Sequence, residues 1–131
     1  MIVERIINRP LDYVRDRVLN LNYYNDWWAD YSAVVDSINK TIKFRPFPFV
    51  YVTLILTRVS SGKIEFSYIK GPLRGIGYWE IVASNDNCTK ISYFIELKTK
   101  WKLLAPILTT PLFKRKHTRD ILNLISRLES T

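Results

Sequence analysis

The sequence has one cysteine, one histidine and four glycines in 131 residues, and these scarcities exclude several classes of protein. The single cysteine, Cys88, excludes an intrachain disulfide and any metal site built from several cysteines. It follows an expected turn at residues 85–87, so a structural role is favoured over a catalytic pair with His117. The longest uncharged apolar run, residues 46–57, is too short to cross a bilayer. The N-terminus carries Glu4 and lacks the apolar stretch of a signal peptide, so we expect a soluble, cytoplasmic protein.

Apolar and aromatic side chains, by contrast, are abundant. Apolar residues make up 47% of the chain and aromatic residues 14%, which is enough both to fill a core and to line a cavity. A chain of 131 residues has the length of one ordinary domain. We therefore expect a single domain spanning residues 1–131.

The net charge of +8 is unevenly placed along the chain. Between residues 97 and 119 there is no carboxylate, and the seven basic residues are Lys98, Lys100, Lys102, Lys114, Arg115, Lys116 and Arg119. A stretch of this kind can attract nucleic acid, anionic lipid or an acidic partner. A solvated helix face and strand end is the simpler interpretation.

Hydrophobic periodicity divides the chain into a strand, two helices, a series of strands and a last helix. Residues 2–8 are rich in β-branched side chains and predict a strand, and Pro10 stands where the first helix can begin. A short second helix is expected at 23–28. Five strand-like runs follow, at residues 32–38, 49–59, 63–70, 77–84 and 89–98. Their short links predict an antiparallel meander.

The last third of the sequence predicts a long amphipathic helix whose beginning is kinked or broken by Pro106 and Pro111. Its apolar stripe is formed by Phe113, His117, Ile121, Leu124, Ile125 and Leu128. An antiparallel sheet with helices on one face is an α+β architecture. A strongly twisted sheet wrapped around this helix would leave a space between the two.

The order of elements and several local patterns resemble the START/polyketide cyclase/Bet v 1 superfamily, also called SRPBCC or helix-grip proteins. The similar segments are IINRPLDYVRDRVLNLNYYNDWW, KGPLRGIGYWEIV, CTKISYFIELK and LLAPILTTPLFKRKHTRDILNLISRLE, which together cover nearly the whole chain. Small coenzyme Q-binding and polyketide cyclase/dehydrase-like proteins are the most similar branch. The resemblance implies a helix-grip fold, with about six strands curved around the C-terminal helix, and a cavity for a lipid, isoprenoid, quinone or polyketide. It implies no reaction, because the superfamily includes carriers, enzymes and regulators.

Strand alternation predicts which side chains face this cavity. The expected inner rows are Ile64, Phe66 and Tyr68; Gly77, Trp79, Ile81 and Ala83; and Ile91, Tyr93, Ile95 and Leu97. The run 49–59 has buriable side chains on both faces, so its inner face stays open. Glu65, Glu80 and Glu96 all fall on the outer face. Acid–base chemistry usually needs a positioned pair. The inward polar groups suit hydrogen bonding to a ligand better, and they are Tyr68, Tyr93, His117, Tyr51 and Thr53.

Eleven residues are expected to line the ligand site: Trp28, Tyr51, Phe66, Tyr68, Gly77, Trp79, Tyr93, Ile95, Leu108, Phe113 and His117. The alternative for the aromatic members is plain core packing, and for His117 a place at the edge of the core. Trp27 and Trp28 are adjacent, so we expect one to be buried and the other exposed near the cavity mouth, where it would suit transient contact with a membrane surface. No catalytic residue, metal or cofactor is predicted.

Three functions are compatible with these features. The first is binding or transport of a hydrophobic small molecule, and the second is a polyketide cyclase or dehydratase acting through His117 with Tyr68 or Tyr93. The third is an RNA- or ribosome-associated regulator that uses the basic stretch 98–119. Nucleic acid is placed last because the chain has no aromatic RNA-binding motif. The oligomeric state stays open.

Three of the four glycines lie in one segment, GPLRGIG, at residues 71–77. A phosphate-binding loop would need a helix after the glycines, whereas Tyr-Trp-Glu-Ile-Val predicts a strand. We interpret Gly71-Pro72 as a turn, and Gly75 and Gly77 as sites where the next strand bulges and bends. Gly77 would also leave room for a ligand beside Trp79, so Gly77→Val should reduce ligand capacity before it unfolds the domain.

Overall fold

The computed structural model describes the chain except for residues 29–32, 48–49, 100–101, 103–105, 107–109 and 131, and it describes only the backbone at residues 46 and 47. In chain order the elements are β1 (Ile2–Ile7), α1 (Leu11–Val18), the 3-10 helix η1 (Leu21–Tyr23), α2 (Tyr24–Trp27), β2 (Val34–Asp36), β3 (Thr41–Phe47), β4 (Val50–Val59), β5 (Lys63–Lys70), β6 (Leu73–Asn85), β7 (Cys88–Thr99) and α4 (Pro111–Ser130). The predicted α+β order is confirmed.

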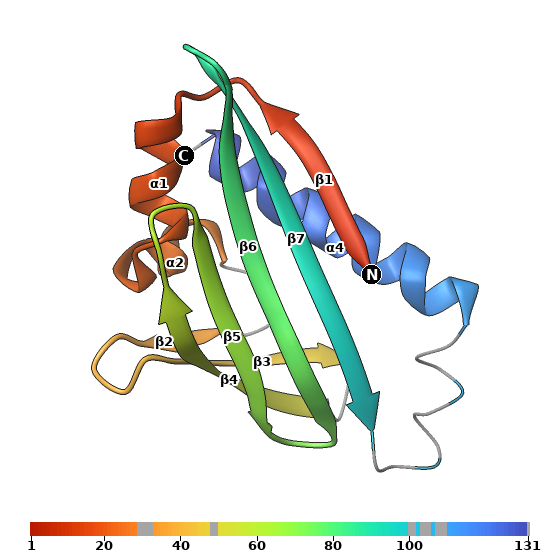
Figure 1. Ribbon diagram of the computed structural model, residues 1–131. Helices are drawn as coiled ribbons and strands as arrows, with labels where there is room; N and C mark the ends of the chain where they lie inside the picture. The colour runs from red at the N-terminus through yellow and green to blue at the C-terminus, as the bar shows by residue number, and fades with distance from the viewer. Residues whose placement is uncertain (29–32, 48–49, 100–101, 103–105, 107–109, 131) are drawn as a thin grey trace.

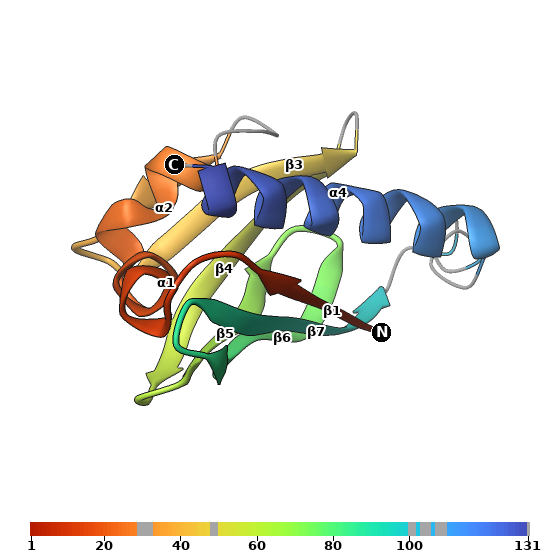
Figure 2. The ribbon, with the colours of Figure 1, turned by 90° about the horizontal axis from the view of Figure 1, so that it is seen from above.

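The strands form one antiparallel sheet that curves around α4. Its order is β1-β7-β6-β5-β4-β3-β2, so β2 to β7 form a meander and β1 joins the far edge by pairing with β7. Figure 1 shows α4 crossing behind the sheet, and Figure 2 shows it lying in the curve between β1 on one side and β3 on the other. Helices α1 and α2 cover the end of this curve near the C-terminus of α4 (Figure 2).

Strand β3 was missed by the sequence prediction, which expected about six strands where the described part of the chain has seven. The segment alternates in the expected way, because Ile42 is fully buried and Phe44 half-buried while Lys43 and Arg45 are exposed. Proline is rare inside strands, and Pro46 concealed this pattern. The ladder with β4 shifts register between Phe44 and Phe47, which accommodates the proline.

The curvature does not come from a bulge at the glycines. Gly75 and Gly77 pair in register with both β5 and β7, so the predicted bulge there is wrong. The register shifts lie instead within the β4–β5 ladder and near the end of the β6–β7 ladder. Gly75 has a positive φ of 146°, and a Cβ there would collide with the carbonyl oxygen of Glu96. Gly71, with φ of 93°, occupies the turn before β6 as expected.

The predicted inner rows are confirmed by burial, with Ala83 as the exception because it is exposed near the end of β6. The buried inner side chains are Ile64, Phe66, Tyr68, Trp79, Ile81, Ile91, Tyr93 and Ile95. The open question about β4 is also settled: Val50, Val52 and Leu54 point inward. Tyr51 is 66% exposed, so this predicted site residue lies outside the cavity.

Helix α4 is capped at its start, fixed to the segment between β1 and α1 at its end, and buried only in its second half. At its start, the Thr110 hydroxyl accepts a hydrogen bond from the backbone N–H of Phe113 at 3.3 Å, and Pro111 occupies the first helical position. Pro111 therefore begins this helix and does not kink it. At its end, Glu129 accepts from the Asn8 backbone N–H at 2.8 Å through its carboxylate and from Arg9 Nε at 2.7 Å through its carbonyl.

Candidate functional site

A row of aromatic rings runs along the interior from α2 to the first half of α4. Trp28 and Trp79 meet edge to face with centroids 6.4 Å apart, and Trp79 packs on Tyr93 at 4.5 Å. Tyr93 then lies 5.9 Å from the His117 ring, which stacks on Phe113 at 5.6 Å. The predicted site residues on β6, β7 and α4 are therefore brought together.

Both tryptophans at the end of α2 are buried, so the expected exposure of one of them is wrong. Trp27 is fully buried and its Nε1 donates to the Arg17 carbonyl at 3.2 Å. Trp28 is 3% exposed and packs on Phe44 at 5.6 Å. Residue 28 leaves helical geometry, with ψ of 55°, and consecutive side chains can therefore both enter the core. A membrane contact through an exposed tryptophan at this place is excluded.

The inner tyrosines are neutral hydrogen-bonding groups. The hydroxyls of Tyr68 and Tyr93 share a hydrogen bond, and burial raises the pKa of each well above its ordinary value. Burial likewise raises the pKa of Tyr24, whose hydroxyl donates to the Val18 carbonyl at 2.6 Å. None of these three phenols gives up its proton near neutral pH, so they serve as donors and acceptors only.

His117 is also neutral. Burial lowers its pKa to about 4, the charges of Lys116 and the N-terminal amine act in the same direction, and Asp120 opposes them. The Nε2 atom is buried and has no hydrogen-bond partner within the part of the chain that the structure describes. This histidine is thus a neutral ring with one buried nitrogen that lacks a partner.

His117 and Tyr68 line one small cavity between the sheet and α4. It holds about 20 Å³, and its other walls are Leu73, Leu97, Phe113, Lys116 and Asp120. A space of this size accommodates about one water molecule or one oxygen atom of a ligand. Its charged side chains pair with each other, since Lys116 Nζ lies 2.7 Å from a carboxylate oxygen of Asp120.

An apolar groove lies beside this cavity. The groove holds about 210 Å³ and is lined by Met1, Ile95, Glu96, Leu97, Phe113 and Lys114. Leu97 and Phe113 belong to both spaces, so their side chains form the wall between them. Phe113 is only half-buried at this shared wall.

Four cavity residues were missed by the sequence prediction of the site: Leu73, Leu97, Lys116 and Asp120. Leu97 had been assigned to the inner face, but not to the ligand site. His117 was expected to be the only titratable group on the inner stripe of the helix, and Asp120 corrects this. The signal was available, because Asp120 lies one turn after both Lys116 and His117, which is the spacing of side chains that meet on a helix.

Two further ring nitrogens are buried without a partner in the described structure, Trp28 Nε1 and Trp79 Nε1. Gly77 lies beside this row, and a Cβ there would be 3.6 Å from the Tyr93 hydroxyl and 3.4 Å from the Phe94 carbonyl oxygen. The structure has room at position 77 for the Cβ of a larger side chain. That Gly77→Val would reduce ligand capacity stays a prediction. Leu108 lies outside the described residues.

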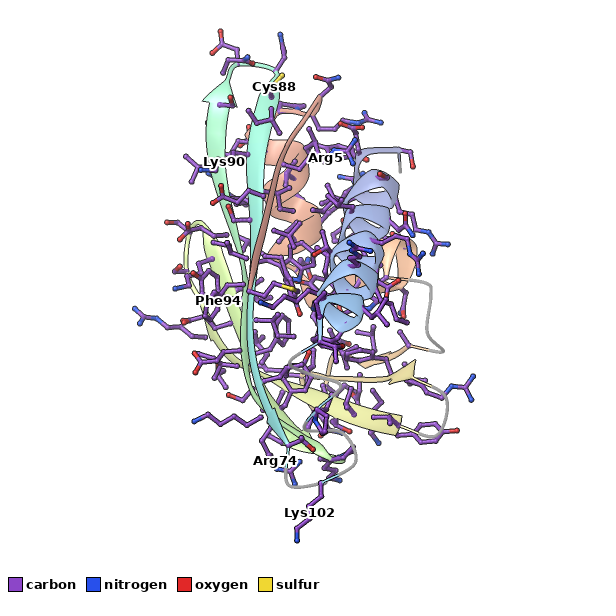
Figure 3. All side chains as sticks on the ribbon, turned by 90° about the vertical axis from the view of Figure 1, so that its right-hand side faces the viewer. Arg5, Arg74, Cys88, Lys90, Phe94 and Lys102 are labelled. Atoms are coloured by element: carbon purple, nitrogen blue, oxygen red, sulfur yellow. The ribbon has the colours of Figure 1, made fainter. Side chains whose placement is uncertain are left out.

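The remaining polar residues of the sequence prediction lie away from the small cavity, although Glu96 borders the groove. Glu65 is half-buried and Glu80 and Glu96 are exposed, all on the outer face as expected. Cys88 lies at the turn between β6 and β7, with Sγ 3.5 Å from Asn8 Oδ1. Figure 3 shows Cys88 at the opposite end of the sheet from Arg74 and Lys102. The Cys88–His117 pair is not formed. His117 contacts the ring of Tyr93 on β7, and Tyr93 lies five residues, or about 17 Å, along this strand from Cys88.

Among the described residues, no helix is long and apolar enough to cross a membrane. The same residues contain no cluster of three or more histidine, cysteine, aspartate or glutamate side chains able to hold a metal ion.

Comparison with known proteins places this architecture in one structural class. No protein-family profile matches the sequence, and no curated protein matches it. Solved structures do: TTHA0849 from Thermus thermophilus superposes with a TM-score of 0.75 at 12% identity, covering 99% of this chain and 94% of that protein. A START superfamily protein from Mycobacterium smegmatis gives a TM-score of 0.68 at 11% identity, covering 99% and 94%.

A third structure, DynU16, is a protein from the dynemicin biosynthetic locus. It gives a TM-score of 0.60 at 12% identity, and the match covers 98% of this chain and 46% of that one. Identities this low establish the fold alone. The chain has the START-like, helix-grip fold that the sequence resemblance implied.

Proposed function

We propose that this protein binds a hydrophobic small molecule between the sheet and the first half of α4, and that it holds or carries this molecule without transforming it. The observation that carries the proposal is the apolar groove of about 210 Å³ beside the polar cavity at His117. A ring-sized ligand fits a space of this volume, since an engineered cavity of about 150 Å³ takes benzene. Lipids, isoprenoids, quinones and polyketides all contain apolar units of this kind.

Binding is favoured over catalysis because of the protonation states in the cavity. A general acid or base works best when its pKa lies near the working pH. His117 has a pKa of about 4, and burial moves the pKa values of Tyr68 and Tyr93 upward, away from neutrality. These groups can orient a ligand, but they exchange protons poorly at pH 7.

The binding proposal is tested with a neutral fluorescent probe, N-phenyl-1-naphthylamine, and two substitutions in the groove. Leu97→Trp should fill the groove and weaken probe binding at least tenfold, whereas Leu97→Ala should preserve it. Ile38→Trp adds the same side chain at a turn position that is 90% exposed, and it should leave binding unchanged. Circular dichroism checks that each variant is folded. Unchanged probe affinity in Leu97→Trp, or no binding by the wild type, would refute the proposal.

A second line of evidence would come from the protein's own cargo. Protein isolated from its native host without denaturation should carry an apolar molecule that organic extraction and mass spectrometry detect. Loss of this molecule in Leu97→Trp, with retention in Ile38→Trp, would place it in the groove.

A cyclase-like activity is the second candidate, and one observation favours it: Tyr68 and His117 line the same cavity. Turnover of a linear poly-β-ketone thioester by the wild type, abolished in His117→Phe, would establish this activity in place of simple binding.

We also propose that the start of α4 contacts a membrane surface. Leu112 is 74% exposed on the first turn of α4, and the exposed Lys114 and Arg115 follow it. An apolar side chain with basic neighbours suits an anionic bilayer. Sedimentation with phosphatidylserine vesicles should fall in Leu112→Ser, and equal sedimentation of both proteins would refute this contact.

A further inference from the structure

The buried ring nitrogens of the interior lack the partners that such groups nearly always have. Buried polar atoms in folded proteins are hydrogen-bonded in the large majority of cases. Here His117 Nε2, Trp79 Nε1 and Trp28 Nε1 are all buried without a partner in the described part of the chain. Trp27, next to Trp28 in sequence, does bond its Nε1 to a backbone carbonyl, at 3.2 Å. The fold therefore supplies a hydrogen-bond acceptor to the indole N–H of one tryptophan and leaves its buried neighbour without one.

His117 is the member of this set whose side chain lines a cavity, although its Nε2 atom is itself covered, so the ring must turn for this atom to reach the cavity. Its ring lines the small cavity, and the cavity's volume of about 20 Å³ has room for one oxygen atom but not for a hydrocarbon ring. The groove on the other side of Phe113 and Leu97 has the opposite character, because it is large and mostly apolar. A single molecule that spans both spaces would place a small polar end at His117 and an apolar body in the groove.

The polarity of that small end follows from the charges around it. His117 is neutral, and the Tyr68 hydroxyl at the same cavity is already bonded to Tyr93. Lys116, the cation among the described walls of the cavity, is paired with Asp120 at 2.7 Å. A ligand carboxylate would therefore lose its hydration without gaining an unpaired cation. A hydrocarbon would leave the histidine nitrogen unsatisfied.

We propose that the neutral His117 carries its proton on Nε2, and that the site therefore selects an apolar molecule with a neutral carbonyl oxygen, such as a ketone, an ester or a quinone, whose oxygen accepts a hydrogen bond from this N–H in the cavity. The inference rests on the proposed function and specifies its ligand. His117 acts here as a specificity-determining residue and takes no part in bond making. The unpartnered indoles of Trp79 and Trp28 give the interior further neutral donors of the same kind.

The test uses three compounds that share one bicyclic skeleton: 1-indanone, indane and 1-indanecarboxylate. Their dissociation constants are measured at pH 7 with the 131-residue protein, by displacement of N-phenyl-1-naphthylamine. The ketone should bind about tenfold or more tightly than indane, because only the ketone satisfies the buried donor, and it should bind more tightly than the carboxylate as well.

Two substitutions of His117 then assign the preference to this residue. His117→Phe keeps an aromatic ring against Phe113 but has no donor, so indanone should lose its advantage while indane affinity is retained. His117→Gln keeps an N–H donor on a side chain of similar length and should restore part of the preference. If indane and indanone bind the wild type equally, or the carboxylate binds best, the inference is wrong and the binding function stands. If none of the three binds, the proposed function itself fails, and the inference falls with it.

Discussion

Acidification should destabilise this protein through His117. The side chain is half-buried with its Nε2 atom fully covered, and this burial lowers its pKa to about 4 in the folded protein against 6.5 for an ordinary exposed histidine. Between these two values the unfolded chain binds a proton that the folded protein does not bind. Stability is therefore complete above pH 6.5 and falls as the pH decreases toward 4. The groups around the ring are Tyr93, Lys116, Asp120 and the N-terminal amine, and their net effect does not reverse this sign.

The magnitude follows from the two pKa values. A factor of ten in proton affinity corresponds to about 1.4 kcal/mol, so the lowered pKa of His117 should cost about 2 kcal/mol of unfolding free energy between pH 7 and pH 5. A loss of this size is measurable, because a domain of this length is stabilised by only about 5–15 kcal/mol.

The assay is urea unfolding followed by tryptophan fluorescence at pH 7 and at pH 5, at constant ionic strength. His117→Gln is the matched variant, since glutamine is polar and of similar length but does not titrate. Carboxylates elsewhere titrate equally in both proteins, so the difference between their two pH-dependent losses isolates His117. Equal losses in wild type and variant would show that this histidine is not held neutral by burial, and the reasoning would be refuted.

Three further predictions concern stability at pH 7, measured by the same unfolding assay. Gly75→Ala should cost more than about 1 kcal/mol, because position 75 has a positive φ and no space for a Cβ, while Gly77→Ala should be tolerated far better; equal costs would contradict this account of the strand. Tyr24→Phe should cost about 1–3 kcal/mol, because it leaves a buried carbonyl without its donor, and a neutral effect would show that the 2.6 Å bond contributes little. Ile125→Ala should cost about 2–5 kcal/mol and Leu112→Ala less than about 0.5 kcal/mol, since the first is fully buried and the second 74% exposed; similar values would disprove the described orientation of α4.

Much of the fold could be predicted from the sequence because its strands alternate cleanly. The segments of β5 and β7 place apolar and polar side chains on opposite faces. The structure confirms this alternation for β5 and the inner row of β7, while Ser92 on the other face of β7 is buried as well. The turns at residues 60–62 and 85–87 could be located from their glycine, serine and asparagine residues. Strand β3 could not be recognised so easily, because Pro46 interrupts its pattern.

The site was harder to predict, because side-chain direction at irregular positions has no sequence period. Tyr51 lies in a strand with apolar side chains on both faces, so only the assembled sheet shows that it points outward. Trp28 follows a helix end, where neither the strand period nor the helix period applies. Asp120 faces the cavity from the border of the apolar stripe, and its pairing with Lys116 makes its position there tolerable.

Because α4 is unequally buried, its two halves should differ in their free energy of local unfolding. The second half buries Ile121, Leu124, Ile125 and Leu128, and its end is fixed by Glu129 to the segment between β1 and α1. The first half has only half-buried contacts at Phe113 and His117. Local unfolding follows the least buried segments, so amide hydrogens in the first turns should exchange well before those in the last turns. A ligand could then enter by releasing two turns of one helix, while the rest of the domain stays folded around its fixed end.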